Sequence, residues 1–158
     1  MFRVVHDLGP ADDISTHSGE LSALPDTERE TVVRARVGQG IFRESLLELW
    51  GGCAVTGIDR ADLVRASHVK PWRVSTNAER LSSHNGLLLL PQYDHLFDRG
   101  YITFDEKGRL EPSPAIVALP PDRLGIAMDA RLRHVFTEQL PFLEYHRQNV
   151  FLKRTTVD

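Results

Sequence analysis

The chain has 158 residues, 41% hydrophobic and 26% charged, which is ordinary for a globular protein and suits one domain rather than two. No apolar run is long enough for a transmembrane helix, and the N-terminal residues lack the apolar stretch and cleavage site of a secretory signal. The one cysteine, Cys53, excludes an internal disulfide and a CxxC zinc motif. We therefore expect a cytoplasmic, single-domain protein without structural zinc.

The net charge of −3 provides no overall basic field for a polyanionic ligand. The distribution is uneven, because the segment from residue 60 to residue 80 is locally rich in cations. These cations are Arg60, Arg65, Lys70, Arg73 and Arg80. A one-sided basic face and an ordinary mixture of solvated charges are equally compatible with this distribution.

Residues 1–25 contain several glycines, prolines and serines, and we expect an arm with a short strand or loop rather than a domain. For the residues that follow, two structures stay open. Asp26 or Thr27 could cap a short helix, with Glu30 closing a capping box from Thr27. Residues 32–37 could instead form a strand.

A helix is predicted over residues 41–50, where apolar side chains recur at helical spacing until two glycines end the run. The sequence CAVTG at residues 53–57 predicts a short strand and a turn whose last glycine takes a positive φ. Next come a predicted strand over residues 63–69, a polar loop over 72–84 and a buried strand over 86–90.

Pro91 suits the first turn of a helix that runs to Asp98, and Arg99-Gly100 ends that helix. Residues 101–110 predict a β-hairpin around an Asp-Glu-Lys-Gly turn. The remaining elements are a proline-rich connection over residues 112–125 and two helices, over 129–138 and 141–152.

Four short motifs stand close together in the middle of the chain. They read CAVTG, ASHVKPW, NGLLL and LFDRG, and the last is followed by YITF. Within them Asn85 follows His68 by seventeen residues, and Asp94 follows Asn85 by nine. This set resembles the HNH endonucleases, a branch of the ββα-metal nucleases. The resemblance is dense from about Gly38 to Phe104, with a weaker echo in FLEYHRQNVF near the end.

The resemblance implies an α+β fold, with a ββα-metal (HNH) core, flanking helices and an additional β-hairpin. The expected organisation is an N-terminal arm and lead-in over residues 1–37, an HNH nuclease core over 38–110, and a C-terminal helical extension of the same domain over 111–158. His146 and Arg147 lie in that extension and have no assigned role.

The resemblance also implies that His68 is the general base of phosphodiester hydrolysis. Imidazole titrates at roughly pH 6.5, so it can take a proton from water near neutral pH. Asn85 is expected to hydrogen-bond across the loop between the strands and so fix the backbone that orients His68. The alternatives are a histidine that only hydrogen-bonds within the sheet and an asparagine that only forms an Asn-Gly turn.

The third motif position departs from the family pattern, because Asp94 stands where a histidine or asparagine is usual, and His95 follows it. Carboxylates suit Mg²⁺ or Mn²⁺ better than imidazole does, so we expect Asp94 to be the main ligand of such a metal cofactor. Asp98, one helical turn further on, is either a second ligand or a partner of Arg99. Ser67 is a second departure, since many HNH enzymes carry an acidic ligand there.

Lys70, Arg73 and Arg99 border the motifs and are candidate phosphate contacts, and His95 contacts DNA or solvent. Solvated surface charge is the alternative for each. The expected function is a metal-dependent endonuclease that cuts or nicks double-stranded DNA, as a homodimer if both strands are cut together. The alternatives are a DNA-binding module of a restriction-type system with weak or no hydrolysis, and an RNA-directed nuclease or toxin.

Overall fold

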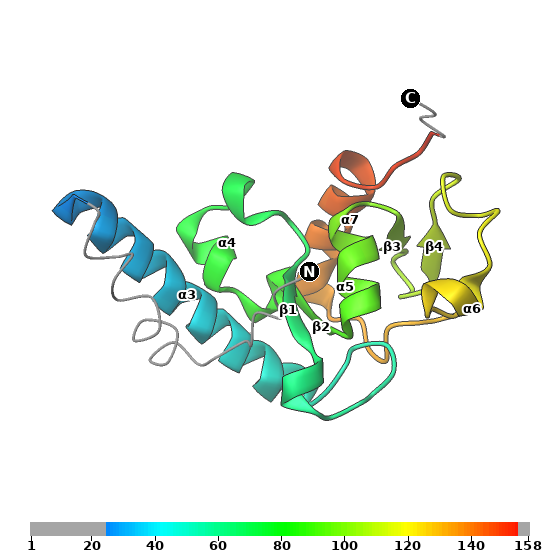
Figure 1. Cartoon of the computed structure of the whole chain (residues 1–158), viewed down its shortest axis with the longest axis horizontal. Helices are drawn as coiled ribbons and strands as arrows, with labels where there is room; N and C mark the ends of the chain where they lie inside the picture. The colour runs from blue at the N-terminus through cyan, green and yellow to red at the C-terminus, as the bar shows by residue number, and fades with distance from the viewer. Residues whose placement is uncertain (1–24, 155–158) are drawn as a thin grey trace.

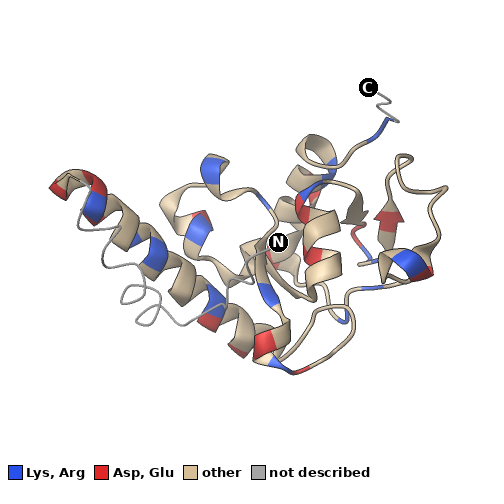
Figure 2. Cartoon of the chain, in the orientation of Figure 1, with Lys and Arg blue, Asp and Glu red and all other residues tan. Residues whose placement is uncertain are grey.

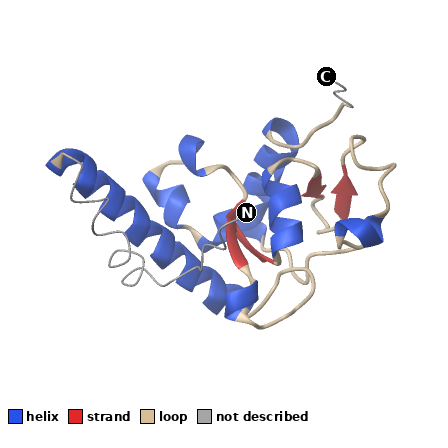
Figure 3. Ribbon diagram, in the orientation of Figure 1, coloured by secondary structure: helices blue, strands red, loops and turns tan. Residues whose placement is uncertain are grey.

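The computed structural model describes residues 25–154, so nearly all of the expected N-terminal arm lies outside the described residues. Helices alternate with two small antiparallel sheets (Figure 1, Figure 3), which is the α+β class that the resemblance implied. The elements are α3 (Asp26–Trp50), η1 (Ala61–Leu63), β1 (Arg65–His68), η2 (Trp72–Val74), α4 (Asn77–Leu81), η3 (Ser83–Asn85), β2 (Gly86–Leu89), α5 (Pro91–Asp98), β3 (Ile102–Phe104), β4 (Leu110–Pro112), α6 (Pro121–Leu124), η4 (Thr137–Gln139) and α7 (Leu140–Asn149). None of the described helices is both long and apolar enough to cross a membrane.

Helix α3 is much longer than the helix predicted over residues 41–50. Residues 32–37 lie inside it, so the alternative strand is wrong, and Pro25 precedes it without a side-chain cap, so the capping box from Thr27 is also wrong. Two acidic residues in the first turn favour the helix start electrostatically. Only its second half reaches the core, where Phe42, Leu46 and Trp50 are buried at a spacing of four residues.

Strands β1 and β2 form an antiparallel ribbon in which His68 pairs with Gly86. The ribbon lies between α3 and α5 (Figure 1), and every residue of β2 is buried. A Cβ on Gly86 would lie 2.5 Å from Phe42 and 2.8 Å from Leu46, so the glycine permits α3 to approach this face closely. Strand, loop, strand and helix therefore occur in the predicted order.

The predicted strand at CAVTG is wrong, because residues 53–57 form a turn closed by a hydrogen bond of 2.9 Å from the Gly57 amide to the Cys53 carbonyl. Gly57 takes the positive φ that was predicted, 76°. The segment over residues 72–84, predicted as a polar loop, instead contains η2, α4 and the start of η3. Within it, the carbonyl of Arg80 lies beside the end of β1, 2.9 Å from His68 Nε2.

The predicted hairpin is confirmed, since β3 and β4 pair with Phe104 opposite Leu110. The helix predicted over residues 129–138 is wrong. Backbone groups of this segment bond to other parts of the chain, with the Leu132 amide donating to Gly108 and the Arg133 amide to Ala54 at 2.7 Å. Extended backbone that is tied to two neighbouring turns cannot also make the local bonds of a helix.

Helix α7 is confirmed, although it is shorter than predicted, and it packs on β3 and the end of α5 through His146. The His146 ring stacks on Phe97, 3.8 Å between centroids, and its Nε2 donates to the Phe97 carbonyl at 2.9 Å. Its Nδ1 accepts from the Thr103 hydroxyl at 2.8 Å. His146, to which the sequence assigned no role, is therefore a buried structural residue that holds α7, α5 and β3 together.

Candidate active site

His68 ends β1 and faces α3. Its ring stacks on Phe42, with 3.7 Å between centroids and 11° between planes, and meets Trp72 edge-on at 5.4 Å. Its Nε2 lies 2.9 Å from the carbonyl oxygen of Arg80. Because a carbonyl only accepts, Nε2 carries the proton and Nδ1 holds the lone pair of the neutral ring.

The Nδ1 atom of His68 is the nitrogen that allows this ring to act as a base. No hydrogen bond to Nδ1 comes from residues 25–154, and the side chain is partly exposed. Burial lowers the pKa of His68 below its ordinary value, and the hydrogen bond to the Arg80 carbonyl opposes this only in part. The imidazole is therefore neutral at neutral pH and can accept a proton at Nδ1.

Asn85 is fully buried at the junction of η3 and β2. Its Oδ1 accepts from the Lys70 amide at 2.8 Å, and its Nδ2 donates to the Glu79 carbonyl at 3.1 Å. A weaker contact of 3.4 Å joins Nδ2 to the Ser75 hydroxyl. One side chain thus connects the residues that follow β1 to helix α4.

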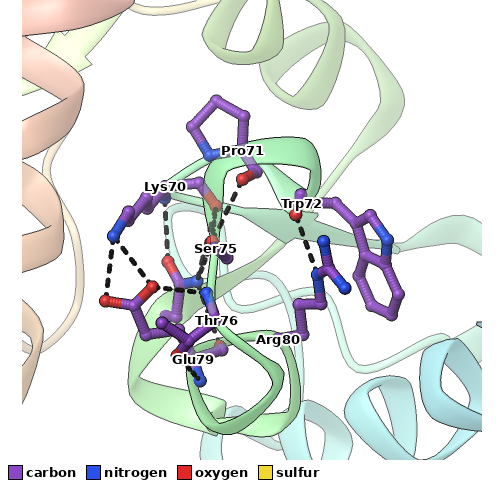
Figure 4. Close-up of polar contacts among 8 residues, drawn as sticks. Lys70, Pro71, Trp72, Ser75, Thr76, Glu79 and Arg80 are labelled. Atoms are coloured by element: carbon purple, nitrogen blue, oxygen red, sulfur yellow. Dashed lines mark hydrogen bonds and ion pairs between the residues drawn. The ribbon is translucent and has the colours of Figure 1, made fainter.

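The loop between β1 and β2 is held by ionic and capping contacts as well (Figure 4). The Lys70 ammonium lies 2.9 and 2.8 Å from the two carboxylate oxygens of Glu79. Glu79 and Thr76 form a capping box at the start of α4. The Arg80 side chain donates to the Trp72 carbonyl at 2.9 Å and lies over its ring at 5.0 Å.

Asp94 lies on α5, which packs on the other face of the ribbon. It is partly exposed and accepts a hydrogen bond from the buried hydroxyl of Ser67. Burial raises the pKa of Asp94, while the Ser67 hydrogen bond and the charge of Arg65 oppose this effect, and the charge of Asp98 adds to it. His95 and Asp98 are exposed to solvent.

No group of three or more His, Cys, Asp or Glu side chains that could hold a metal lies together within residues 25–154. The carboxylates of Asp94 and Asp98 nevertheless offer hard oxygen donors, and a cation beside Asp94 would offset the cost of its burial. Mg²⁺ keeps several waters and is commonly held by one or two carboxylates. The two carboxylates therefore fit a hydrated Mg²⁺ or Mn²⁺.

His68 and Asp94 lie on opposite faces of the ribbon. Neighbouring residues of a strand point to opposite faces, and Ser67 bonds to Asp94 whereas His68 stacks on Phe42 of α3. Within the described chain β1 pairs only with β2, so its second edge carries no strand. The unpaired edge of β1 therefore lies between His68 on one face and Asp94 on the other.

Three of the predicted residues line one cleft of about 600 Å³. The cleft lies between the loop after β1 and the ends of α5 and α7, and its lining residues are Pro71, Trp72, Arg73, Asp98, Arg99, Asn149 and Val150. Arg73 and Arg99 are exposed, and neither forms an ion pair with another described residue. Lys70 and His95 lie outside this lining.

Charges of both signs alternate along α3, whereas the loop after β1 carries basic residues (Figure 2). The sequence pattern did not identify Glu79 or the Arg80 carbonyl as parts of the site. The spacing of Thr76 and Glu79 was a detectable signal, because a threonine followed three residues later by glutamate is typical of a capping box.

Comparison with known proteins agrees with this geometry. Residues 53–105 match the sequence model of the HNH endonuclease family, which covers β1, β2, α5 and β3. No curated protein matches the chain. Residues 53–105 are therefore similar to the HNH endonucleases both in sequence and in their order of strand, loop, strand and helix.

Proposed function

We propose that this protein is a metal-dependent endonuclease that hydrolyses phosphodiester bonds of DNA, with His68 as the general base and Asp94 as the main metal ligand. The HNH endonuclease match indicates nuclease activity on nucleic acid. The roles of the individual residues rest mainly on one observation. Neutral His68 bonds to the Arg80 carbonyl through Nε2, and its Nδ1 has no hydrogen-bond partner among residues 25–154.

His68 takes a proton from the attacking water at Nδ1. The Phe42 ring and the Arg80 carbonyl hold the imidazole from two directions, so the Nδ1 lone pair keeps one orientation. Positioned general bases contribute about 10²- to 10⁴-fold to such reactions. Asn85 supports this arrangement by accepting from the Lys70 amide and donating to the Glu79 carbonyl, so it fixes the loop backbone at both points.

HNH nucleases generally use a divalent metal. In this chain Asp94 would hold it, with Asp98 as the second carboxylate, since Asp98 lies one turn further along α5 and is close enough to influence the Asp94 carboxyl. When bound, such a metal polarises the scissile phosphate and stabilises negative charge on the leaving oxygen. Ser67 orients the Asp94 carboxylate through its hydroxyl.

In this proposal the two faces of the ribbon contribute different groups, the base His68 and the metal ligand Asp94. A phosphodiester at the unpaired edge of β1 would have His68 on one side and Asp94 on the other. This arrangement suits in-line displacement, in which the attacking water and the leaving oxygen lie on opposite sides of the phosphorus. The opposite placement of His68 and Asp94 is thus compatible with one shared reaction centre.

Arg73 and Arg99 are the best candidates for phosphate contact, because both are exposed, unpaired within the described residues and gathered at one cleft. His95 is exposed on α5 and is a further candidate for DNA contact. Lys70 is a weaker candidate, since its ammonium is held by Glu79 and its side chain is only 19% exposed. DNA backbone binding relies on such free cations.

The experiment that tests this function is cleavage of supercoiled plasmid in Mg²⁺, Mn²⁺ and EDTA. We expect the wild type to nick with either metal and not in EDTA. Asp94→Ala should lower the rate by at least about 100-fold, because metal stabilisation is worth several kcal/mol. Asp122→Ala, an exposed aspartate on α6, is the matched control and should cut like the wild type.

A second candidate is a DNA-binding module with the HNH fold and little hydrolysis. Ser67 in place of an acidic ligand and the lack of a three-ligand cluster within residues 25–154 favour it. It predicts DNA affinity that does not respond to Mg²⁺ and no nicking with either metal. Equal cleavage by wild type and Asp94→Ala would instead remove the aspartate from the proposed mechanism.

A further inference from the structure

We propose that Glu79 is the positioning residue of the base: it fixes α4 so that the Arg80 carbonyl holds His68 with its lone pair on Nδ1. This inference rests on the proposed function of His68 and adds a residue that acts through it. Glu79 touches neither the histidine ring nor the metal ligand. Figure 4 shows its ion pair with Lys70 and its hydrogen bond with Thr76. The contact that reaches the base is the one between the Arg80 carbonyl and His68.

Helix α4 has only five residues and depends on its ends. A helix this short is unstable by itself, so the groups that cap it decide its geometry. The Thr76 amide donates to the Glu79 carboxylate at 2.8 Å, and the Glu79 amide donates to the Thr76 hydroxyl at 3.2 Å. These two bonds form the complete capping box.

The same carboxylate ties α4 to the end of β1. Lys70, two residues after His68, places its ammonium against both Glu79 oxygens and over the ring of Tyr145 on α7 at 5.3 Å. The Lys70 and Glu79 side chains are only 19% and 27% exposed, so this pair is screened less than a surface pair. Glu79 therefore links the strand that carries the base to the helix that orients it.

Two successive carbonyls of α4 bind the two motif residues. The Glu79 carbonyl accepts from Asn85 Nδ2 at 3.1 Å, and the Arg80 carbonyl lies 2.9 Å from His68 Nε2. A rotation or fraying of α4 would displace both carbonyls together. The capping box thus controls the orientation of the asparagine and the histidine at once.

The chemical consequence is the choice of tautomer. Neutral imidazole carries its proton on either nitrogen, and only a fixed acceptor at Nε2 leaves Nδ1 as the base. Without that acceptor part of the population would protonate Nδ1 and present no lone pair there. Loss of Glu79 should therefore lower kcat rather than raise KM, because substrate contacts at Arg73 and Arg99 are unchanged.

The test combines nitrogen-15 NMR of the imidazole rings with single-turnover cleavage. The chain has 7 histidines, and the His68 signals are assigned by their loss in His68→Ala. We expect the wild type to be protonated at Nε2, and Glu79→Ala to show a mixture of tautomers with kcat lower by roughly 10- to 100-fold. Glu79→Gln keeps the capping box, since glutamine also serves at this position, and should restore both readouts.

Two variants of Thr76 and one control variant keep the test independent of folding defects. Thr76→Ala breaks the same capping box from its other side and should reproduce the Glu79→Ala tautomer mixture, whereas Thr76→Ser should not. Asp62→Ala, which removes an exposed carboxylate paired with Arg60 at 2.8 Å, is the matched control for a lost ion pair.

The outcomes separate this inference from the proposed function. An unchanged His68 tautomer in Glu79→Ala overturns the inference, even if cleavage slows, because the loss then acts through another route. A changed tautomer in Glu79→Ala and Thr76→Ala supports it. If wild-type protein cuts no nucleic acid, the proposed function fails, while the tautomer readout still decides what Glu79 does to His68.

Discussion

Two histidines of this chain are held in nearly the same way and yet have different capacities. His68 stacks on Phe42 at 3.7 Å and His146 stacks on Phe97 at 3.8 Å. Each places Nε2 at 2.9 Å from a backbone carbonyl. Ring stacking and a carbonyl partner are therefore not what distinguishes a candidate base from a structural histidine.

The difference lies at the second nitrogen. Nδ1 of His146 accepts from Thr103 at 2.8 Å, and the side chain is 1% exposed. Burial lowers the pKa of His146 to about 4. Nδ1 of His68 has no hydrogen-bond partner within residues 25–154, and its ring is partly exposed. A histidine whose two nitrogens are both bonded can hold the fold together, whereas one free nitrogen leaves a base.

The largest expected effect comes from removing the free nitrogen. His68→Ala should lower cleavage by about 10²- to 10⁴-fold, the contribution of a positioned general base. The measurement is the single-turnover nicking rate in saturating Mg²⁺, with thermal unfolding to show that the variant is folded.

The control for this prediction is His134→Ala, because His134 is exposed and its ring meets Phe136, at 4.3 Å between centroids, rather than His68. It should cut at the wild-type rate. A folded His68→Ala protein that still cuts within a few-fold of wild type would show that the comparison between the two histidines misidentifies the base.

The second effect concerns stability and pH. His146 has a folded-state pKa of about 4, below the value of roughly 6.5 in the unfolded chain. The unfolded state therefore binds the proton first, so stability is full above about pH 6.5 and is lost as the pH falls toward 4. The shift corresponds to about 3 kcal/mol in the free energy of unfolding.

The measurement is urea unfolding of the wild type and His146→Gln at several pH values between about 7 and 4. Carboxylates contribute equally to both proteins, so the difference between their pH dependences isolates His146. The wild type should lose about 3 kcal/mol more than the variant over this interval. Parallel curves would mean that the ring is protonated without cost and is not a buried clamp.

Local signals in the sequence predicted several of the elements that carry the candidate site. Pro91 at the first turn and Arg99-Gly100 after the last predicted α5 with both of its ends. These features depend on residues close together in sequence. Local propensity and capping are sufficient for such elements.

The rest of the site and of the fold depends on tertiary contacts that no pattern of side chains in the sequence predicts. The partner of His68 is the backbone carbonyl of Arg80, and every residue has a carbonyl, so the sequence gives no reason to choose this one. The predicted helix over residues 129–138 failed because its backbone bonds to Gly108 and Ala54 instead. Tertiary hydrogen bonds override local propensity in both cases.

The smallest expected effects come from the cleft beside the base. Arg73→Ala and Arg99→Ala should each weaken DNA binding and reduce the slope of log affinity against log salt by about 0.9, because each removes one phosphate contact. Arg123→Ala, an exposed arginine on α6 outside the cleft, should leave the slope unchanged.

The double variant should lose about twice the slope of either single one if both cations touch the same DNA. Unchanged slopes for Arg73→Ala and Arg99→Ala would show that DNA does not bind at this cleft. This result would not disturb the contrast between the two histidines, because that contrast rests on the hydrogen bonds of their ring nitrogens and not on the arginines.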